Sequence, residues 1–181
     1  MYIKKFVFTF AQLNVNTMGK LELIMETEKV SMYSPKYDGE KQNEFEKFLS
    51  EYRFQTNPQL KIFFDAILSA LEKMGETGAY ERYFRLEGGN IKAIPLYITI
   101  PRVNRNTGKM RLYCLRLSDR MLILGRGTVT TVQKNAEDPV ILAIIGNLRD
   151  IERQIKTITR KGNTNFDVFY SLRQIIETIN V

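Results

Sequence analysis

Apolar and polar residues alternate at the start of the chain, which is typical of strands with one buried face. The alternation covers residues 2–10 and returns in residues 21–25, and turn-forming asparagine and glycine residues separate the two segments. The pattern predicts an N-terminal β-hairpin within residues 1–33. Residues 34–39, with the sequence Ser-Pro-Lys-Tyr-Asp-Gly, are expected to form a turn-rich connector.

Helical spacing appears in the next two segments. Apolar side chains recur at i, i+3, i+4 and i+7 from Phe45 to Tyr52, so that they share one stripe of a helix. In the second segment Asn57 is expected to cap a helix whose first turn contains Pro58 and which Gly75 ends. The short connection between the two segments predicts antiparallel helices.

From about residue 81 the apolar positions repeat every second residue, which predicts a run of strands. We expect strands at residues 81–86, 92–99, 111–117 and 121–128. Pro95 places its strand at an edge of the sheet or ends it. Two more helices are expected, one beginning at Asp138 and Pro139 and one over residues 166–179.

The order of these elements indicates an α+β fold, in which helices pack mainly on one face of an antiparallel sheet. The length of 181 residues suits a single domain. We divide it into the hairpin (residues 1–33), a core (41–148) and a C-terminal helical extension (149–181).

The composition excludes several kinds of chemistry. The chain has no histidine, which rules out Ser-His and Cys-His catalysis and zinc sites built on imidazole. The single cysteine, Cys114, is interpreted as a small core residue in a reducing, cytoplasmic compartment. No window is apolar enough for a membrane span. We therefore expect no metal, no cofactor and no membrane contact.

Positive charge is concentrated in the second half of the chain. Residues 1–90 hold 12 basic and 13 acidic side chains, whereas residues 91–181 hold 15 and 7. Between residues 92 and 126, eight basic residues face one acid, Asp119. Such an excess usually marks a polyanionic partner, most often nucleic acid, although solubility alone also produces it.

Pairs of arginine and tyrosine residues suggest that this positive charge contacts RNA. Alternation places Arg111 and Tyr113 on one face of a strand, and Tyr83 and Arg85 on one face of an earlier strand. An exposed arginine beside an exposed tyrosine offers a phosphate contact beside a stacking surface, as single-stranded RNA requires. Half-buried tyrosines beside solvated arginines explain each pair equally well.

Other basic residues extend this candidate surface. We predict nucleic-acid contacts from Tyr83, Arg102, Arg105, Lys109, Arg116, Arg120 and Arg126. The Gly125-Arg126-Gly127 stretch lacks the helix start that a phosphate loop needs, so it is interpreted as a flexible strand end. Arg160 and Lys161 are interpreted as cations that favour the dipole at a helix end.

Short motifs in the middle of the chain follow the two expected helices. They are Tyr-Phe-Arg at 83–85, Arg-Leu-Tyr-Cys-Leu-Arg-Leu at 111–117, Met-Leu-Ile-Leu-Gly-Arg-Gly at 121–127 and the helix start Glu137-Asp138-Pro139. With these motifs the chain resembles the RelE/HigB/ParE toxin superfamily of toxin-antitoxin systems, over roughly residues 43–148. In that superfamily a helical hairpin precedes an antiparallel sheet that carries an arginine and an aromatic residue on one strand.

The resemblance implies an mRNA interferase that acts at the ribosome and is inhibited by a small antitoxin protein. Such an endoribonuclease needs no metal, because the ribose 2′-OH attacks its own phosphate and the protein supplies charge and a proton donor. The implied catalytic residues are Arg85 and Arg111, which would stabilise charge, and Tyr113, which would transfer the proton. Tyr83 would stack a base.

Two other functions are compatible with the sequence. One is a nucleic-acid or ribosome binder that keeps the basic sheet but does not cut RNA. The other is a structural or interaction module of a phage or mobile element, whose helices mediate homo-oligomers. Steeply salt-dependent RNA binding without cleavage would indicate the first, and RNA affinity no greater than that of any basic protein would indicate the second.

Overall fold

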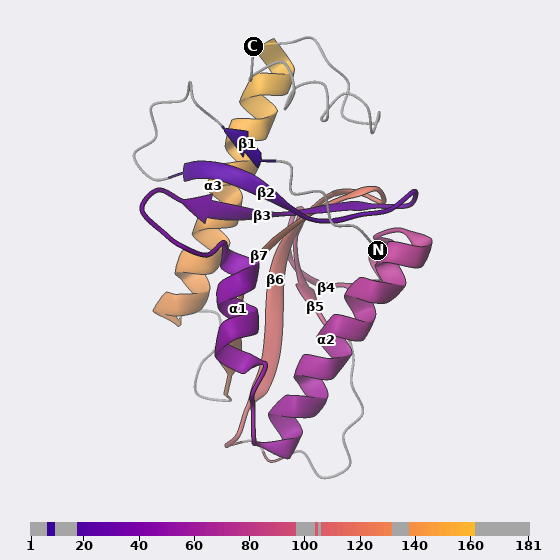
Figure 1. Ribbon diagram of the computed structural model, residues 1–181, viewed down its shortest axis with the longest axis vertical. Coiled ribbons are helices and arrows are strands. Elements are labelled where there is room, and N and C mark those ends of the chain that lie inside the picture. Colours follow the sequence, from indigo (N-terminus) through magenta and orange to yellow (C-terminus); the bar gives the residue numbers. More distant parts are fainter. Residues whose placement is uncertain (1–6, 10–17, 97–103, 105, 132–137, 162–181) are drawn as a thin grey trace.

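Seven strands form one sheet in the computed structural model, which describes residues 7–9, 18–96, 104, 106–131 and 138–161 (Figure 1). The strands are β1 (Val7–Thr9), β2 (Met18–Glu26), β3 (Ser31–Tyr37), β4 (Arg85–Gly88), β5 (Ile91–Ile94), β6 (Lys109–Ser118) and β7 (Met121–Thr130). The helices of the described residues are α1 (Glu44–Tyr52), α2 (Pro58–Thr77), α3 (Pro139–Lys161) and the short 3₁₀ helix η1 (Glu81–Tyr83).

The sheet has the strand order β1-β2-β3-β7-β6-β5-β4. Among the described strands, β3 and β7 are paired in parallel, and all other neighbours are antiparallel. The expected N-terminal hairpin is present as β1 and β2. The predicted α+β class is confirmed, and the parallel pair makes the sheet mixed.

β3 corrects the turn-rich connector expected at residues 34–39. Its first five residues are buried between β2 and β7. The Ser34 hydroxyl donates to the carbonyl oxygen of Leu124 in β7 (2.8 Å) and accepts from the backbone N–H of Phe45 in α1 (3.0 Å). Serine and proline are typical turn residues, and these tertiary hydrogen bonds stabilise Ser34 in an interior strand.

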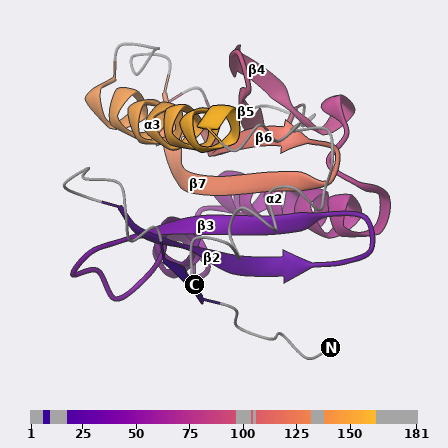
Figure 2. The same ribbon diagram turned by 90° about the horizontal axis from the view of Figure 1, so that it is seen from above.

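Helices cover both faces of the sheet, whereas we expected them mainly on one face. α1 and α2 pack on one face together with Leu112 and Cys114 of β6, and α3 packs on the other face with Tyr113 and Leu115. Figure 2 shows α3 and α2 on opposite sides of β6 and β7. Because side chains of β6 alternate between the two cores, all four are buried.

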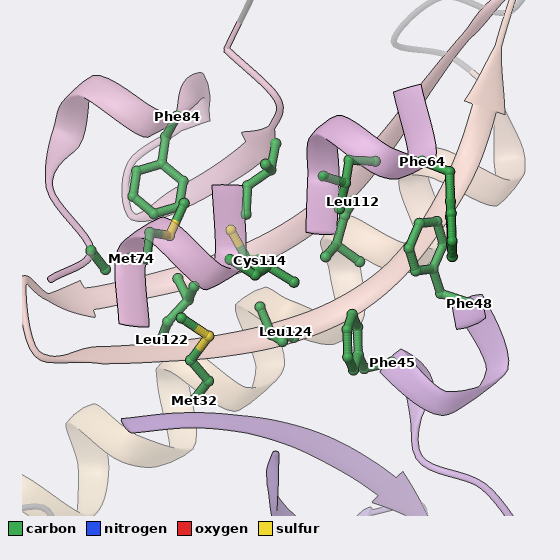
Figure 3. Close-up of a cluster of buried hydrophobic side chains, with 14 of the residues drawn as sticks. Met32, Phe45, Phe48, Phe64, Met74, Phe84, Leu112, Cys114, Leu122 and Leu124 are labelled. Carbon is green, nitrogen blue, oxygen red and sulfur yellow. The ribbon is translucent and has the colours of Figure 1, made fainter. Parts of the chain in front are cut away.

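The core beneath α1 and α2 is rich in aromatic rings and sulfur (Figure 3). The ring centroids of Phe48 and Phe64 lie 5.5 Å apart between the two helices. Met74 and Phe84 lie together at the other end of this core. Cys114 is fully buried in the same core, which confirms its interpretation as a core residue, and burial raises the pKa of its thiol.

Asparagine caps begin the two helices that the sequence predicts. Asn43 accepts a hydrogen bond from the N–H of Glu46 (2.9 Å) ahead of α1, and Asn57 accepts from the first N–H groups of α2. α2 runs past Gly75, where its end was expected, and stops before Gly78. The φ of Gly78 is 105°, a value that glycine adopts more readily than other residues.

The segment after α2 differs from the strand predicted at residues 81–86. Residues 81–83 form η1, and β4 begins only at Arg85. β5 ends at Ile94, immediately before Pro95, which confirms that this proline ends its strand. In the described sheet β4 pairs with β5 alone and therefore forms one edge.

The expected helix start at Asp138 is confirmed. The Asp138 carboxylate accepts a hydrogen bond from the N–H of Val140 (2.8 Å) in the first turn of α3. α3 then runs without a break to Lys161, so the division expected at residue 148 lies within one helix. The helix expected over residues 166–179 lies outside the described residues.

Gly125 and Gly127 lie in the interior of β7, which corrects their interpretation as a flexible strand end. The register of β7 against β6 shifts at this point, which marks a β-bulge. A Cβ on Gly125 would lie 3.2 Å from Leu148 of α3, and a Cβ on Gly127 would overlap the ring of Phe48 in α1. The two glycines therefore allow a helix to approach each face of the sheet closely.

Candidate nucleic-acid interface

Arg85, Arg111 and Tyr113 lie on one face of the sheet. Arg85 of β4 and Tyr113 of β6 both pair with Ala93, which lies between them in β5. Glu87 joins the two arginines, because its Oε1 atom lies 3.2 Å from Arg85 Nε and 3.7 Å from Arg111 Nη1. The three implied catalytic residues are thus brought together around a carboxylate.

Tyr113 is buried, which corrects the interpretation of an exposed tyrosine beside Arg111. Its side chain is 1% exposed and lies in the core beneath α3, together with Ile144 and Leu148. Burial raises the pKa of Tyr113 above its usual 10.0, although the neighbouring Arg111 acts in the opposite direction. A buried phenol with a raised pKa is a poor proton donor to RNA bound at the surface.

Glu87 is the residue of this cluster that the sequence interpretation missed. Its side chain and that of Arg111 are each less than one-fifth exposed, so water screens their attraction weakly. Glu87 Oε1 is buried and has no hydrogen bond from the described residues, so the two arginines are what offsets its burial. The available signal was the spacing of Arg85 and Glu87, which puts both on one strand face.

Tyr83 belongs to η1, so strand alternation does not relate it to Arg85. Its hydroxyl lies 2.9 Å from Thr77 Oγ1 and accepts a hydrogen bond from Arg82 Nη2 (3.4 Å). These two contacts lower the pKa of Tyr83. The ring is partly buried against the core of α1 and α2.

Arg116 is bound within the protein. Its Nε donates to the carbonyl oxygen of Ala79 (2.7 Å), and its Nη atoms pair with Glu81 (3.0 Å) and Asp119. The buried Lys92 also pairs with Glu81 (3.2 Å). These interactions hold the start of η1 against the sheet, so the charge of Arg116 already has partners inside the fold.

The other basic residues that we predicted to contact nucleic acid differ in their exposure and in their ion pairs. Arg126 pairs with Glu51 of α1 (3.2 Å). Lys109 and Arg120 are exposed, at the start of β6 and in the turn before β7. Arg102 and Arg105 lie outside the described residues. Carboxylates therefore neutralise a substantial part of the basic surface that the sequence predicts.

A line of exposed cations on α3 was not predicted. Its members are Arg149, Arg153, Lys156 and Arg160. Intervals of four, three and four residues place them on one side of the helix. The line is about 16 Å long, given the rise of an α-helix. This spacing was the available signal, and the interpretation of Arg160 as a helix-end cation overlooked it.

The cations of this line differ in their partners. Arg153 pairs with Asp150, and Lys156 Nζ lies 2.5 Å from Glu152 Oε1. Within the part of the chain that the structure describes, Arg149 and Arg160 have no carboxylate partner. Among the described residues, two of the four positive charges therefore have no carboxylate to release before they bind a ligand.

The line of cations adjoins the β4 edge of the sheet. Glu152 accepts a hydrogen bond from Asn90 Nδ2 (2.9 Å) in the turn between β4 and β5. Arg149 Nη2 lies 3.7 Å from the position that a Cβ on Gly88 would take. Arg85, about half exposed, stands on the same edge strand. We name this surface the α3–β4 flank, and it consists of Arg85, Arg149, Arg153, Lys156 and Arg160.

The described residues contain neither a metal-binding cluster nor a membrane-spanning helix. No group of three or more histidine, cysteine, aspartate or glutamate side chains there could hold a metal ion. No described helix is both long enough and apolar enough to cross a bilayer.

No protein-family model, no curated protein and no solved structure matches this chain. The resemblance to the toxin superfamily therefore stays a prediction, as do the residue roles that it implies.

Proposed function

We propose that this protein binds RNA through the α3–β4 flank and does not cut it. The observation that carries the proposal is the straight line of four exposed cations on α3, beside the exposed Arg85. Phosphates recur along a nucleic-acid strand, so a row of cations contacts several of them at once. Charges that serve only solubility need no such alignment.

The ion pairs on the flank leave its charge accessible. Arg153 and Lys156 are each more than half exposed. Exposed pairs contribute about 0–1 kcal/mol, so a phosphate replaces a carboxylate partner at small cost. Arg149 and Arg160 have no carboxylate partner among the described residues, so a phosphate has none to replace there.

Cleavage receives less support from the geometry. The chain has no histidine, and Tyr113 is buried beneath α3. Arg111 is held by Glu87 in a partly buried ion pair. A general acid has to come within about 3 Å of the atom that it protonates, and α3 covers the Tyr113 phenol and separates it from RNA bound at the surface.

Removal of charge tests the proposal. Replacement of Arg149, Arg153, Lys156 and Arg160 by glutamine should weaken binding to a single-stranded RNA oligonucleotide by about tenfold or more. The plot of log K against log salt concentration should become less steep, with the magnitude of its negative slope smaller by about 3. The matched control replaces four exposed cations elsewhere, Lys29, Lys41, Arg53 and Lys61, by glutamine.

Equal losses of affinity in the two variants would mean that net charge alone attracts RNA, and the flank would be rejected. The unmodified protein should leave a labelled RNA intact in the presence of a metal chelator. RNA fragments with 2′,3′-cyclic phosphate ends, absent with Tyr113→Phe, would instead support the mRNA interferase.

A further inference from the structure

The turn between α2 and β4 contains an arginine next to two tyrosine rings. Arg82 Cζ lies 5.1 Å from the ring centroid of Tyr80 and 5.2 Å from that of Tyr83. Both distances fall within the range of cation–π interactions, about 6 Å. Tyr80 is 41% exposed and Arg82 is exposed, so this cluster faces solvent.

Hydrogen bonds hold this turn in place. The N–H of Ala79 donates to the carbonyl oxygen of Asp119 (2.6 Å), and Arg116 Nε donates to the carbonyl oxygen of Ala79 (2.7 Å). The N–H of Tyr83 donates to the carbonyl oxygen of Tyr80 (3.1 Å). A surface that is already ordered loses little entropy when it binds a ligand.

We infer that Tyr80 stacks against a nucleobase of single-stranded RNA, and that Arg82 donates to the adjoining phosphate. This inference rests on the proposed RNA-binding function and names the class of RNA that is bound. Stacking requires an exposed base face, and the bases of a duplex are already stacked on one another. An aromatic ring beside an arginine is a combination that suits single strands of any sequence.

The cluster of Tyr80, Arg82 and Tyr83 lies next to the α3–β4 flank along the chain. η1 leads through Phe84 into β4, whose first residue is Arg85. Because Tyr83 and Phe84 pack against the core of α1 and α2, a strand whose phosphates follow the flank to Arg85 has to pass around the β4 edge to reach Tyr80. In this inference one RNA strand makes both the phosphate contacts on the flank and the stacking contact at Tyr80.

A tryptophan at this position provides a direct probe, because the chain contains none. In the Tyr80→Trp variant, indole fluorescence should be quenched by a uridine oligonucleotide. It should stay unchanged with an abasic RNA of the same length and charge. The contrast between the two ligands reports stacking separately from phosphate binding.

Affinities give a second test. Tyr80→Ala should weaken binding of the uridine oligonucleotide by about tenfold and leave binding of the abasic RNA within about twofold, while Tyr80→Phe keeps both affinities. The matched control is Phe54→Ala, which removes a 79% exposed ring that lies 4.7 Å from Arg53 Cζ ahead of α2. This control should change neither affinity.

Three results would overturn the inference. They are equal losses for both ligands with Tyr80→Ala, equal affinity of the unmodified protein for uridine and abasic RNA, and stronger binding of a duplex than of a single strand. Each of these leaves the proposed RNA-binding function standing. Failure of the unmodified protein to bind any of these RNAs would reject that function itself.

Discussion

The Ser34 hydroxyl donates a 2.8 Å hydrogen bond to the carbonyl oxygen of Leu124, and both residues are fully buried. The same hydroxyl oxygen accepts from the N–H of Phe45 (3.0 Å) in the first turn of α1. One side chain thus joins the parallel strands β3 and β7 to the helix that packs on them. It satisfies a buried carbonyl and one of the N–H groups that a helix start leaves free.

Ser34→Ala should lower the free energy of unfolding by about 1–3 kcal/mol, because it leaves the N–H of Phe45 without a partner in a buried site. Chemical denaturation followed by circular dichroism measures the change. Ser50→Ala is the control, since its hydroxyl accepts an exposed hydrogen bond from Gln42 (2.7 Å). If the two variants are equally stable, the Ser34 contacts contribute nothing to the fold.

Gly127→Ala should destabilise the protein by about 2 kcal/mol or more, because the added Cβ would overlap the ring of Phe48 in the core. Gly146→Ala should have the opposite effect. Gly146 lies within α3 with no atom within 4 Å of an added Cβ, so alanine should stabilise the helix by about 0.5–1 kcal/mol. Thermal unfolding of the two variants checks both signs, and a stable Gly127→Ala variant would contradict the close packing of α1 on β7.

Acid should weaken the link between β2 and α1 at Glu22. Burial by itself would raise the pKa of this carboxyl, but the hydrogen bond from Asn43 Nδ2 (3.0 Å) and the charges of Lys20 and Lys36 outweigh it and lower the pKa below 4.5. The folded state therefore binds the proton less readily than the unfolded state. The resulting stability is present above about pH 4.5 and is lost as pH falls through the lowered pKa.

Glu22→Gln should accordingly reduce stability at pH 7 by on the order of 1 kcal/mol and have a smaller effect at pH 3. Urea unfolding at the two pH values measures this difference. The exposed Glu28→Gln is the control and should change stability little at either pH. A Glu22→Gln effect that does not depend on pH would contradict the role of its charge.

Tyr113→Phe should leave RNA affinity unchanged, because the phenol is buried beneath α3 and is not exposed on the flank. It should lower the free energy of unfolding by about 1 kcal/mol, because the buried phenol loses its polar interaction with the neighbouring Arg111. Filter binding and denaturation on the same preparation check both effects. A large loss of RNA affinity at unchanged stability would place Tyr113 at the RNA-binding surface after all.

Local signals predicted the elements that depend on nearby residues. The caps at Asn57 and Asp138 involve N–H groups two or three residues away, so their chemistry is readable in the sequence. The end of β5 before Pro95 is equally local. The strand β3 was missed because its polar residues are stabilised by groups far away in the chain, such as Leu124.

We did not predict that α3 covers the sheet face that carries Arg111 and Tyr113, although the sequence contains a sign of it. Residues 112–115 and 121–124 are unbroken apolar runs, as expected of strands that are buried on both faces. The alternation was interpreted as one buried and one exposed face. That interpretation placed Tyr113 in solvent.

The sequence by itself determined the absence of histidine chemistry, the α+β order of elements and the concentration of basic residues in the second half. Only the tertiary structure decided which of those charges are available. Arg116 meets Glu81 across 35 residues and Arg126 meets Glu51 across 75, whereas Arg149 stays free among the described residues. The physical reason is that ion pairing depends on distance through space, which the folded backbone sets and which separation along the chain does not reveal.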